Sequence, residues 1–318
     1  MIYFRPNSIG TLSLTTLLFL SLLGTTASLE SENWPSFRGP DALSTVGDDP
    51  LLPVTWSSTE NVVWKTPVQG LGWSSPVIWE DHIFVTTVIN EGEEEEPRMG
   101  LYFPYGSPET MVDPRFPDPK EGDLMERSPD LHHWIVSAID FDSGDMLWST
   151  EVHSAVPDFD RHLKNTYASS TPVTDGNRVY VYFGNVGVYA LDFHGGIVWE
   201  QRFESSSTRL GWGPAASPVL HDNKLFIVND NDEQSFVVAL DSATGQELWR
   251  VNRDEGTNWS TPFVWENENR TELVTAGSDQ VRAYDLEGNL LWNFSGLNTI
   301  SIPQPFSAHG LLYVTSGY

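Results

Sequence analysis

The sequence predicts an all-β fold, specifically a β-propeller built from four-stranded antiparallel blades. Two features carry this prediction. A turn that leads into a tryptophan recurs along the chain, and a small or polar residue followed by proline recurs in phase with it. Repeats with a period of roughly 40–50 residues and four short strands per unit are typical of propellers.

The clearest copy of the turn lies within residues 237–250. Residues 237–241 alternate between two faces, which is the period-2 pattern of a strand. In the turn that follows, Asp241 can accept backbone N–H groups, and Gly245 can take a positive φ without a Cβ clash. Trp249 is expected to dock between neighbouring blades. The equivalent structural residues of the other copies are Asp140 and Trp148, Asp192 and Trp199, and Asp285 and Trp292.

The second landmark places proline after a small or polar residue near the start of each unit. The innermost strands of a propeller converge on a central channel, so small side chains there satisfy a packing requirement. The same positions would line a ligand site in the channel mouth. The copies are Ser75-Pro76, Thr171-Pro172, Ser217-Pro218, Thr261-Pro262 and a looser Gln304-Pro305.

These landmarks divide the chain into blades. Residues 61–67 read as a tryptophan-bearing outer strand without a unit of its own. We expect this strand to join the last blade and close the ring, because closure removes exposed sheet edges. Four and a half blades leave a ring open, so we expect a fragment of a protein with roughly 7–8 blades. The expected blades are 73–152 with an insertion at 90–132, then 168–203, 213–251, 259–296 and a partial blade at 302–318.

Composition narrows the function classes. The chain has 318 residues and no cysteine, which excludes disulfides, thiolate metal sites, thiol nucleophiles and lipid attachment through cysteine. Its 44 acidic and 17 basic residues give a formal charge of −27, which disfavours binding to nucleic acid and to anionic membranes. A solvated acidic surface explains this charge most simply, and capture of cations is the alternative.

The N-terminus has the pattern of an export signal. Arg5 precedes an apolar run from Leu12 to Leu23, which is too short for a comfortable transmembrane helix. We expect cleavage after Ala27 and a periplasmic or extracellular protein without a membrane anchor, and an uncleaved anchor is the alternative. Residues 28–60 are expected to form an extended arm that docks on the main body. The insertion at 90–132 is acidic and then rich in proline and aromatic residues. We expect it to form a partly ordered flap on one face, and a disordered loop is the alternative.

The repeat resembles the PQQ-like β-propeller repeat, the tryptophan-docking repeat of quinoprotein alcohol dehydrogenases. The same repeat occurs in the outer-membrane-assembly propeller lipoprotein. The residues that carry the resemblance are the pattern A-x-D-x-x-x-G-x-x-x-W at Ala239–Trp249, with shorter versions at Ala190–Trp199 and Ala283–Trp292. Residues 33–40 and 162–176 also resemble exported bacterial proteins of this repeat class. The resemblance is specific for the fold and weakly specific for function.

The resemblance implies pyrroloquinoline quinone and calcium as possible cofactors, held in the dehydrogenases by Glu, Asn and Asp ligands beside a vicinal cysteine pair. That pair is impossible here. A negatively charged quinone also requires cationic donors, and Arg38 and Lys164 are the candidates. No catalytic residue stands out. A quinoprotein oxidoreductase with part of its site outside this sequence therefore remains the alternative function.

Metal binding has two further candidate positions. Asp230 and Asp232, in an oxygen-rich loop at 229–233, are candidate calcium ligands. The loop lacks the glycine and the distal bidentate glutamate of a 12-residue calcium loop, which favours an ordinary turn. The adjacent residues His132 and His133 point to opposite faces of a strand, which disfavours joint ligation of one ion.

Four aromatic residues precede the inner strands, and they are candidates for a rim around the channel mouth: Trp73, Tyr167, Trp212 and Trp259. Their alternative role is to cap the packing between blades. We predict an exported, non-catalytic binding or scaffold protein that engages a protein, peptide or glycan at the propeller face as a monomeric ring. An accessory propeller of a polysaccharide-processing system is a third possibility.

Overall fold

The computed structural model describes residues 33–47, 52–94, 103–104, 124–125, 127–298 and 300–317. The chain divides into a unit of residues 1–31 and a unit of residues 32–318, and every described residue belongs to the second. The expected export signal and most of the insertion at 90–132 lie outside the described residues. Within the described part, no helix is long and apolar enough to cross a membrane.

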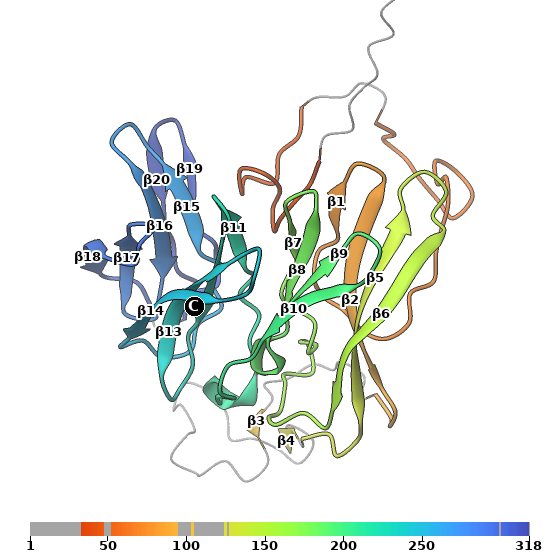
Figure 1. The fold of residues 1–318 in the computed structure, drawn as a ribbon, viewed down its shortest axis with the longest axis horizontal. Coiled ribbons are helices and arrows are strands. Elements are labelled where there is room, and N and C mark those ends of the chain that lie inside the picture. Colours follow the sequence, from red (N-terminus) through yellow and green to blue (C-terminus); the bar gives the residue numbers. More distant parts are fainter. Residues whose placement is uncertain are drawn as a thin grey trace, which may run out of the picture. The chain divides into compact units, whose positions relative to one another are not determined.

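Four antiparallel sheets of four strands follow one another along the chain (Figure 1). The first has the order β1-β2-β5-β6, with bounds Val77–Trp79, His82–Asn90, His132–Asp140 and Met146–Ala155. The second contains β7 (Val173–Thr174), β8 (Arg178–Tyr182), β9 (Val188–Asp192) and β10 (Ile197–Gln201). The third contains β11 (Val219–His221), β12 (Lys224–Asn229), β13 (Ser235–Asp241) and β14 (Glu247–Arg253).

The fourth sheet contains β15 (Phe263–Glu266), β16 (Thr271–Ala276), β17 (Gln280–Tyr284) and β18 (Leu290–Ser295). A hairpin of β19 (Phe306–Ala308) and β20 (Leu311–Tyr313) follows, and β3 (Phe103–Pro104) pairs in parallel with β4 (Leu124–Met125). The described helices are two 3₁₀ turns, η2 (Gly184–Val186) and η3 (Arg209–Gly211). The predicted all-β propeller fold with four-stranded blades is therefore confirmed.

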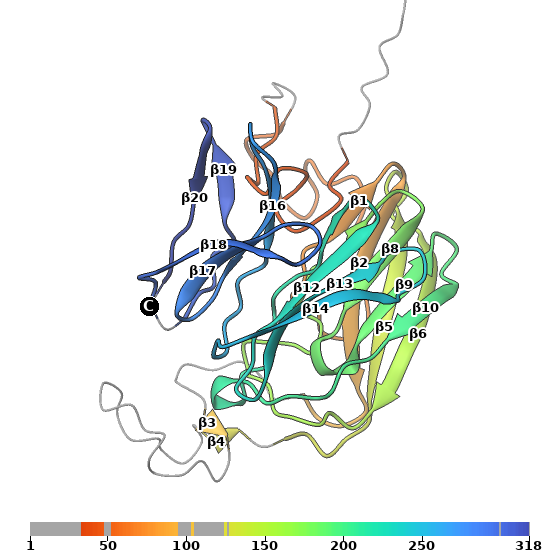
Figure 2. The same cartoon turned by 60° about the vertical axis from the view of Figure 1, so that its left-hand side comes forward.

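The first strands of successive sheets contact one another in chain order, from β1 to β7, β11, β15 and β19. Figures 1 and 2 show the sheets ranged in the same sequence, from orange and yellow through green and cyan to blue. We call the four complete sheets blades 1 to 4. The innermost strand of each blade thus lies next to that of the following blade, as a propeller requires.

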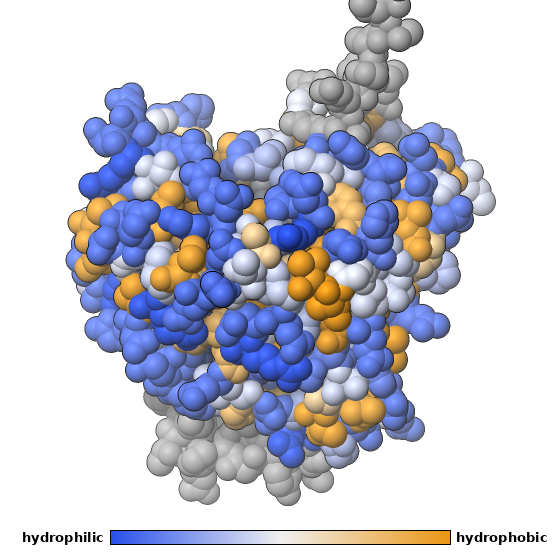
Figure 3. Space-filling view, viewed as in Figure 1, coloured by the Kyte–Doolittle hydropathy of each residue, from blue (hydrophilic) through white to orange (hydrophobic). Residues whose placement is uncertain are grey.

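The hydrophobic core lies between neighbouring blades. Val179 and Val181 of β8 pack into the cluster shared with blade 1, whereas Tyr180 and Tyr182 pack into the cluster shared with blade 3. Alternate side chains of a strand point to opposite faces, so both faces of this strand are buried. This explains its uninterrupted apolar sequence. The face shown in Figure 3 is mostly hydrophilic, with apolar residues in small patches.

The repeat tryptophans of blades 1 to 3 each dock on the turn of the next blade. The indole N–H of Trp249 donates to the carbonyl of Leu286 at 2.9 Å, and a Cβ on Gly288 would lie 2.8 Å from the Trp249 ring. Gly288 has φ +88°, so this turn needs glycine for its backbone and for its contact. Trp148 docks on Phe193 and Gly195 in the same way, and Trp199 docks on Ser242 and Gly245.

The aspartates of the repeat hold the turns together. In the copy at residues 237–250, Oδ1 of Asp241 accepts from the main-chain N–H and the hydroxyl of Thr244, both at 2.8 Å. Asp140, Asp192 and Asp285 accept main-chain N–H groups in their own turns in the same manner.

The segment at 61–67 behaves differently from the expectation of a paired strand. It pairs with no strand in the described part of the chain. Trp64 nevertheless docks on blade 1 as the repeat tryptophans dock on later blades, because its indole N–H donates to the carbonyl of Phe141 at 2.9 Å and its ring lies against Gly144. The closing of a ring by this segment stays a prediction.

In blade 4, the indole of Trp292 donates to Oε2 of Glu272, within its own blade.

A ladder of hydrogen bonds joins the starts of the inner strands. The main-chain N–H of Ser75 donates to Oγ1 of Thr171 at 3.0 Å, that of Thr171 to Oγ of Ser217 at 2.9 Å, and that of Ser217 to Oγ1 of Thr261 at 3.0 Å. These are the residues that precede proline in the repeat. A hydroxyl at this position therefore satisfies a buried N–H of the preceding blade.

The arm docks on the inner strands, as far as it is described. Trp34 exchanges two main-chain hydrogen bonds of 2.9 Å with Ile78, and the carbonyl of Pro35 accepts from the N–H of Thr174 at 2.9 Å. The arm thereby spans blades 1 and 2.

Candidate binding site at the inner strands

A hollow opens where the inner strands begin, with a cavity volume of about 290 Å³. We call it the inner hollow. Most of its lining is apolar or carries a hydroxyl group, and Lys164 is the one charged side chain in that lining. The lining residues are Phe37, Trp73, Lys164, Asn165, Ser169, Thr171, Ala215, Ser217, Trp259, Thr261 and Ile302.

Two of the predicted rim aromatics face this hollow. Trp73 is 50% exposed, and the main chain holds it in place through the bond from its N–H to the carbonyl of Ala168 at 3.1 Å. Trp259 is held more tightly, because its indole N–H donates to the carbonyl of Gly213 at 2.7 Å and its ring lies 5.9 Å from that of Trp212. Trp73 is therefore the more available contact surface, and Trp259 is its fixed counterpart.

The segment 161–165 positions Lys164 beside these rings. The main-chain N–H of Lys164 donates to Nδ1 of His162 at 3.0 Å, and the side chain of Asn165 donates to the carbonyl of Trp212 at 2.7 Å. Burial, followed by the charge of Lys164, lowers the pKa of His162 to about 4. The imidazole is thus neutral near pH 7 and keeps Nδ1 available as an acceptor.

The other predicted site residues lie elsewhere. Tyr167 faces away from the inner hollow, donates its hydroxyl to the carbonyl of Phe159 at 2.8 Å, and has its pKa raised by burial. Trp212 packs behind Trp259 against Leu163. Arg38 donates from Nε to Oγ of Ser44 at 3.0 Å and does not line the hollow, whereas its neighbour Phe37 does.

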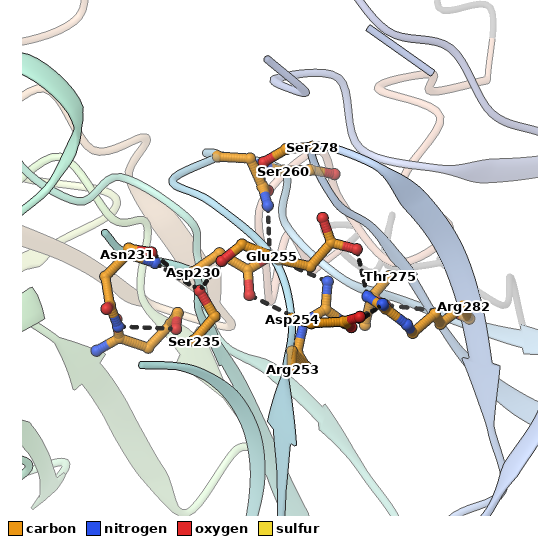
Figure 4. Close-up of polar contacts among 12 residues, drawn as sticks. Asp230, Asn231, Ser235, Arg253, Asp254, Glu255, Ser260, Thr275, Ser278 and Arg282 are labelled. Carbon is orange, nitrogen blue, oxygen red and sulfur yellow. Dashed lines mark hydrogen bonds and ion pairs between the residues drawn. The ribbon is translucent and has the colours of Figure 1, made fainter. Parts of the chain in front are cut away.

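A buried ion pair fixes the loop that carries Trp259 (Figure 4). Arg253 donates from Nε and Nη2 to the two carboxylate oxygens of Asp230 at 2.9 and 3.0 Å, and neither side chain is exposed. The side-chain amide of Asn258 donates to the same carboxylate. Burial alone lowers the pKa of Arg253, but the carboxylate of Asp230 outweighs it and raises that pKa above its ordinary value. Because Asn258 directly precedes Trp259, this ion pair supports the wall of the inner hollow.

The network continues into blade 4. Arg282 of β17 pairs with the buried carboxylate of Glu255 and with Asp254, whose side chain is 86% exposed. Figure 4 shows Arg282 reaching toward the loop from the neighbouring blade. The segment after β14 is therefore tied to both blades 3 and 4.

The two candidate calcium ligands, Asp230 and Asp232, both have hydrogen-bond partners within the protein. Both oxygens of Asp230 are bound to Arg253, and Oδ1 of Asp232 accepts the hydroxyl of Thr257 at 2.6 Å. Across the described residues, no group of three or more His, Asp or Glu side chains is arranged to hold a metal ion. The sequence analysis did not single out Arg253 or Arg282. Arg282, in the middle of the otherwise uncharged strand β17, was the available signal.

Comparison with known proteins agrees with this architecture. Residues 132–257 and 204–316 match the family described as outer membrane protein assembly factor BamB, and together they span more than half of the chain. The chain belongs to this family. The predicted resemblance to the PQQ-like propeller repeat is confirmed. No curated protein matches the chain.

Solved structures show the same type of propeller. The quinohemoprotein alcohol dehydrogenase from Comamonas testosteroni is 16% identical with a TM-score of 0.54, and the match covers 89% of this chain and 45% of that one. BamB from Moraxella catarrhalis is 19% identical with a TM-score of 0.40, covering 56% of this chain and 52% of that one. The chain thus spans about half the length of these structures. At such identities the likeness concerns the fold alone.

The described residues do not fit a quinone–calcium site. Calcium prefers several carboxylate and carbonyl oxygens, and the carboxylates near the inner hollow are engaged by Arg253 and Arg282. A quinone with several carboxylates requires several cationic donors, and Lys164 is the one cation that lines the inner hollow. We therefore derive no chemical step through this cofactor.

Proposed function

We propose that this chain is part of an exported, non-catalytic propeller that binds a segment of another protein at the inner hollow. The observation that carries the proposal is the pairing of Trp73, half-exposed on a fixed main chain, with Trp259 across one apolar hollow beside Lys164. Rigid aromatic side chains and a flanking charge are typical of binding hot spots.

The chemistry of the lining indicates the kind of segment that fits. The two indoles and Phe37 favour an apolar or aromatic side chain, and Lys164 favours a neighbouring carboxylate. The family description, an assembly factor for outer membrane proteins, supports a protein partner. Export and the absence of a membrane anchor belong to this proposal as well.

Site-specific photo-cross-linking tests the proposal. A photo-reactive phenylalanine analogue at position 73 should capture a defined partner in cells, while the same analogue at position 56 should not. Trp56 is the matched control, because it is 72% exposed and does not line the inner hollow. Trp73→Ala should abolish complex formation with the captured partner, and Trp56→Ala should preserve it, with unchanged melting temperatures for both. Equal capture at both positions, or full binding by Trp73→Ala, would sink the proposal.

A separate titration addresses the quinoprotein alternative. We expect no stoichiometric quinone absorbance when pyrroloquinoline quinone and Ca²⁺ are added to the full-length protein. Saturable binding of one quinone per chain would favour the oxidoreductase function instead.

A further inference from the structure

A second, more enclosed pocket lies on the other side of the segment 165–169, between blades 1 and 2. We call it the interblade pocket. Its cavity volume is about 190 Å³, and it shares Asn165 and Ser169 with the inner hollow. Its walls are strongly aromatic, with Trp134, Phe159, Tyr167, Phe183 and Phe203 among the lining residues.

One polar atom in this pocket lacks a partner. Oδ1 of Asp160 is buried and has no hydrogen-bond partner among the residues that the structure describes. Burial raises the pKa of Asp160, although the charge of Arg127 opposes the shift. A buried polar group without a partner costs free energy, so native proteins nearly always satisfy it through protein, water or ligand. Asp160 therefore lacks a hydrogen-bond donor that a ligand in the pocket would supply.

The arginines at the pocket have partners other than Asp160, and Arg161 also lies over the ring of Tyr167 at 5.6 Å. Arg161 donates to the carbonyl of Asn165 at 2.8 Å and pairs with Glu94 at 2.8 Å. Arg202 lies 3.2 Å from Nδ1 of His153, and Nη1 of Arg127 donates to the main-chain carbonyl of Asp158 at 3.3 Å. None of these contacts reaches the free oxygen of Asp160.

The neighbouring carboxylate and imidazole are also accounted for. The side chain of Asp158 accepts the hydroxyl of Ser205 at 2.5 Å. Burial and the charge of Arg202 lower the pKa of His153, which favours a neutral ring near pH 7. The group without a hydrogen-bond partner in the interblade pocket is therefore a carboxylate oxygen, and it shares the lining with several aromatic side chains.

We propose that the interblade pocket binds a small organic ammonium ion, with the ammonium group donating to Oδ1 of Asp160 and an apolar body lying against the aromatic walls. Cations are attracted to aromatic faces as well as to carboxylates. A cavity of about 150 Å³ holds one benzene molecule, so a pocket of about 190 Å³ fits a single ring that carries a short amine. The formal charge of −27 raises the local concentration of cations around the protein. This proposal does not depend on the protein partner at the inner hollow.

Titration with three matched compounds tests the charge requirement. Benzylamine is the probe, benzyl alcohol its neutral counterpart and benzoate its anionic counterpart. Binding to the intact chain is followed by calorimetry and by amide shifts in NMR spectra. We expect saturable binding of one benzylamine, with benzyl alcohol about tenfold or more weaker, because hydrogen bonds to charged groups contribute more than neutral ones. Equal binding of the amine and the alcohol, tighter binding of benzoate, or no binding would overturn the proposal.

Variants distinguish binding in the interblade pocket from general attraction of the amine by the negatively charged surface. Asp160→Asn should weaken benzylamine binding about tenfold or more, with an unchanged melting temperature. Asp279→Asn, an exposed aspartate in blade 4, removes the same charge far from the pocket and should leave binding unchanged. Phe203→Leu should also weaken binding, since it removes one aromatic wall. Equal losses in Asp160→Asn and Asp279→Asn would show that only the net charge attracts the amine.

Discussion

The main-chain N–H of Thr171 donates to the hydroxyl of Ser217 at 2.9 Å, and so joins the inner strand of blade 2 to that of blade 3. Ser217 in turn donates its own N–H to Thr261 at 3.0 Å. The small residue before each proline is therefore a link in a chain of interblade hydrogen bonds. This role explains why serine or threonine, rather than alanine, recurs at Thr171, Ser217 and Thr261.

Removal of one link should destabilise the fold. Ser217→Ala leaves the buried N–H of Thr171 without its acceptor and should lower the free energy of unfolding by about 1–3 kcal/mol. Ser217→Thr is the matched control, because threonine occupies the equivalent positions of blades 2 and 4, and it should be nearly neutral. Urea denaturation of both variants measures the difference. Equal stability of the two variants would contradict the role of the hydroxyl.

The tryptophan docking turn should not tolerate a side chain at its glycine. Gly288→Ala places a Cβ 2.8 Å from the ring of Trp249 and forces alanine into a positive φ. Gly310→Ala is the control, because Gly310 also has a positive φ but has nothing within 4 Å. Backbone strain should cost about 1–2 kcal/mol in both, and the contact with Trp249 about 1–3 kcal/mol more in Gly288→Ala. Thermal unfolding measures both variants. Equal losses of stability in Gly288→Ala and Gly310→Ala would contradict a role for the docking of Trp249.

The buried ion pair of Asp230 and Arg253 should contribute far more to stability than the exposed contact of Asp254 with Arg282. Asp230→Asn leaves Arg253 charged in the interior, which should cost about 3–5 kcal/mol of stability. Asp254→Asn removes an 86% exposed carboxylate that pairs with Arg282, and should cost less than about 1 kcal/mol. Chemical denaturation of the two variants gives the comparison. A small loss in Asp230→Asn would mean that the pair does not brace this loop.

The pKa of His162 should be lower than that of an ordinary histidine. Its ordinary pKa is near 6.5, and burial together with Lys164 lowers it to about 4 in the folded chain. The folded state thus favours the neutral ring, so its stabilising contribution is present above pH 6.5 and is lost as the pH falls toward 4. Imidazole NMR resonances recorded from pH 3 to 8 measure this, with His162→Gln supplying the assignment. A midpoint near 6.5 would show that the ring is not buried as described.

The fold was accessible to prediction because its determinants are local and repeated. Asp241, Gly245 and Trp249 recur in register, and each copy reports the same turn and the same docking contact. The site was less accessible. Trp73 and Trp259 each lie three residues before the proline of their repeat and face the inner hollow. Tyr167 and Trp212 lie five and six residues before theirs and do not line it.

The two charged networks were also beyond prediction. Asp230 follows β12 and Arg253 ends β14, with β13 between them, and Arg282 comes from the next blade. Nothing local in the sequence shows that these charged residues contact one another. An aspartate next to asparagine residues, such as Asp230, is equally consistent with a turn and with a metal ligand. The free oxygen of Asp160 is a property of its surroundings, and the sequence carries no signal for it.

By itself, the sequence determined the class of the fold, the turn chemistry and the tryptophan contacts, because these depend on residues that lie close together and repeat. Tertiary structure alone decided which hydroxyls link the blades, which carboxylates are neutralised by arginine, and which one is left facing a pocket. The physical reason is that burial and charge compensation arise from residues distant in the chain, such as Asp160 and Phe203, once neighbouring blades pack together.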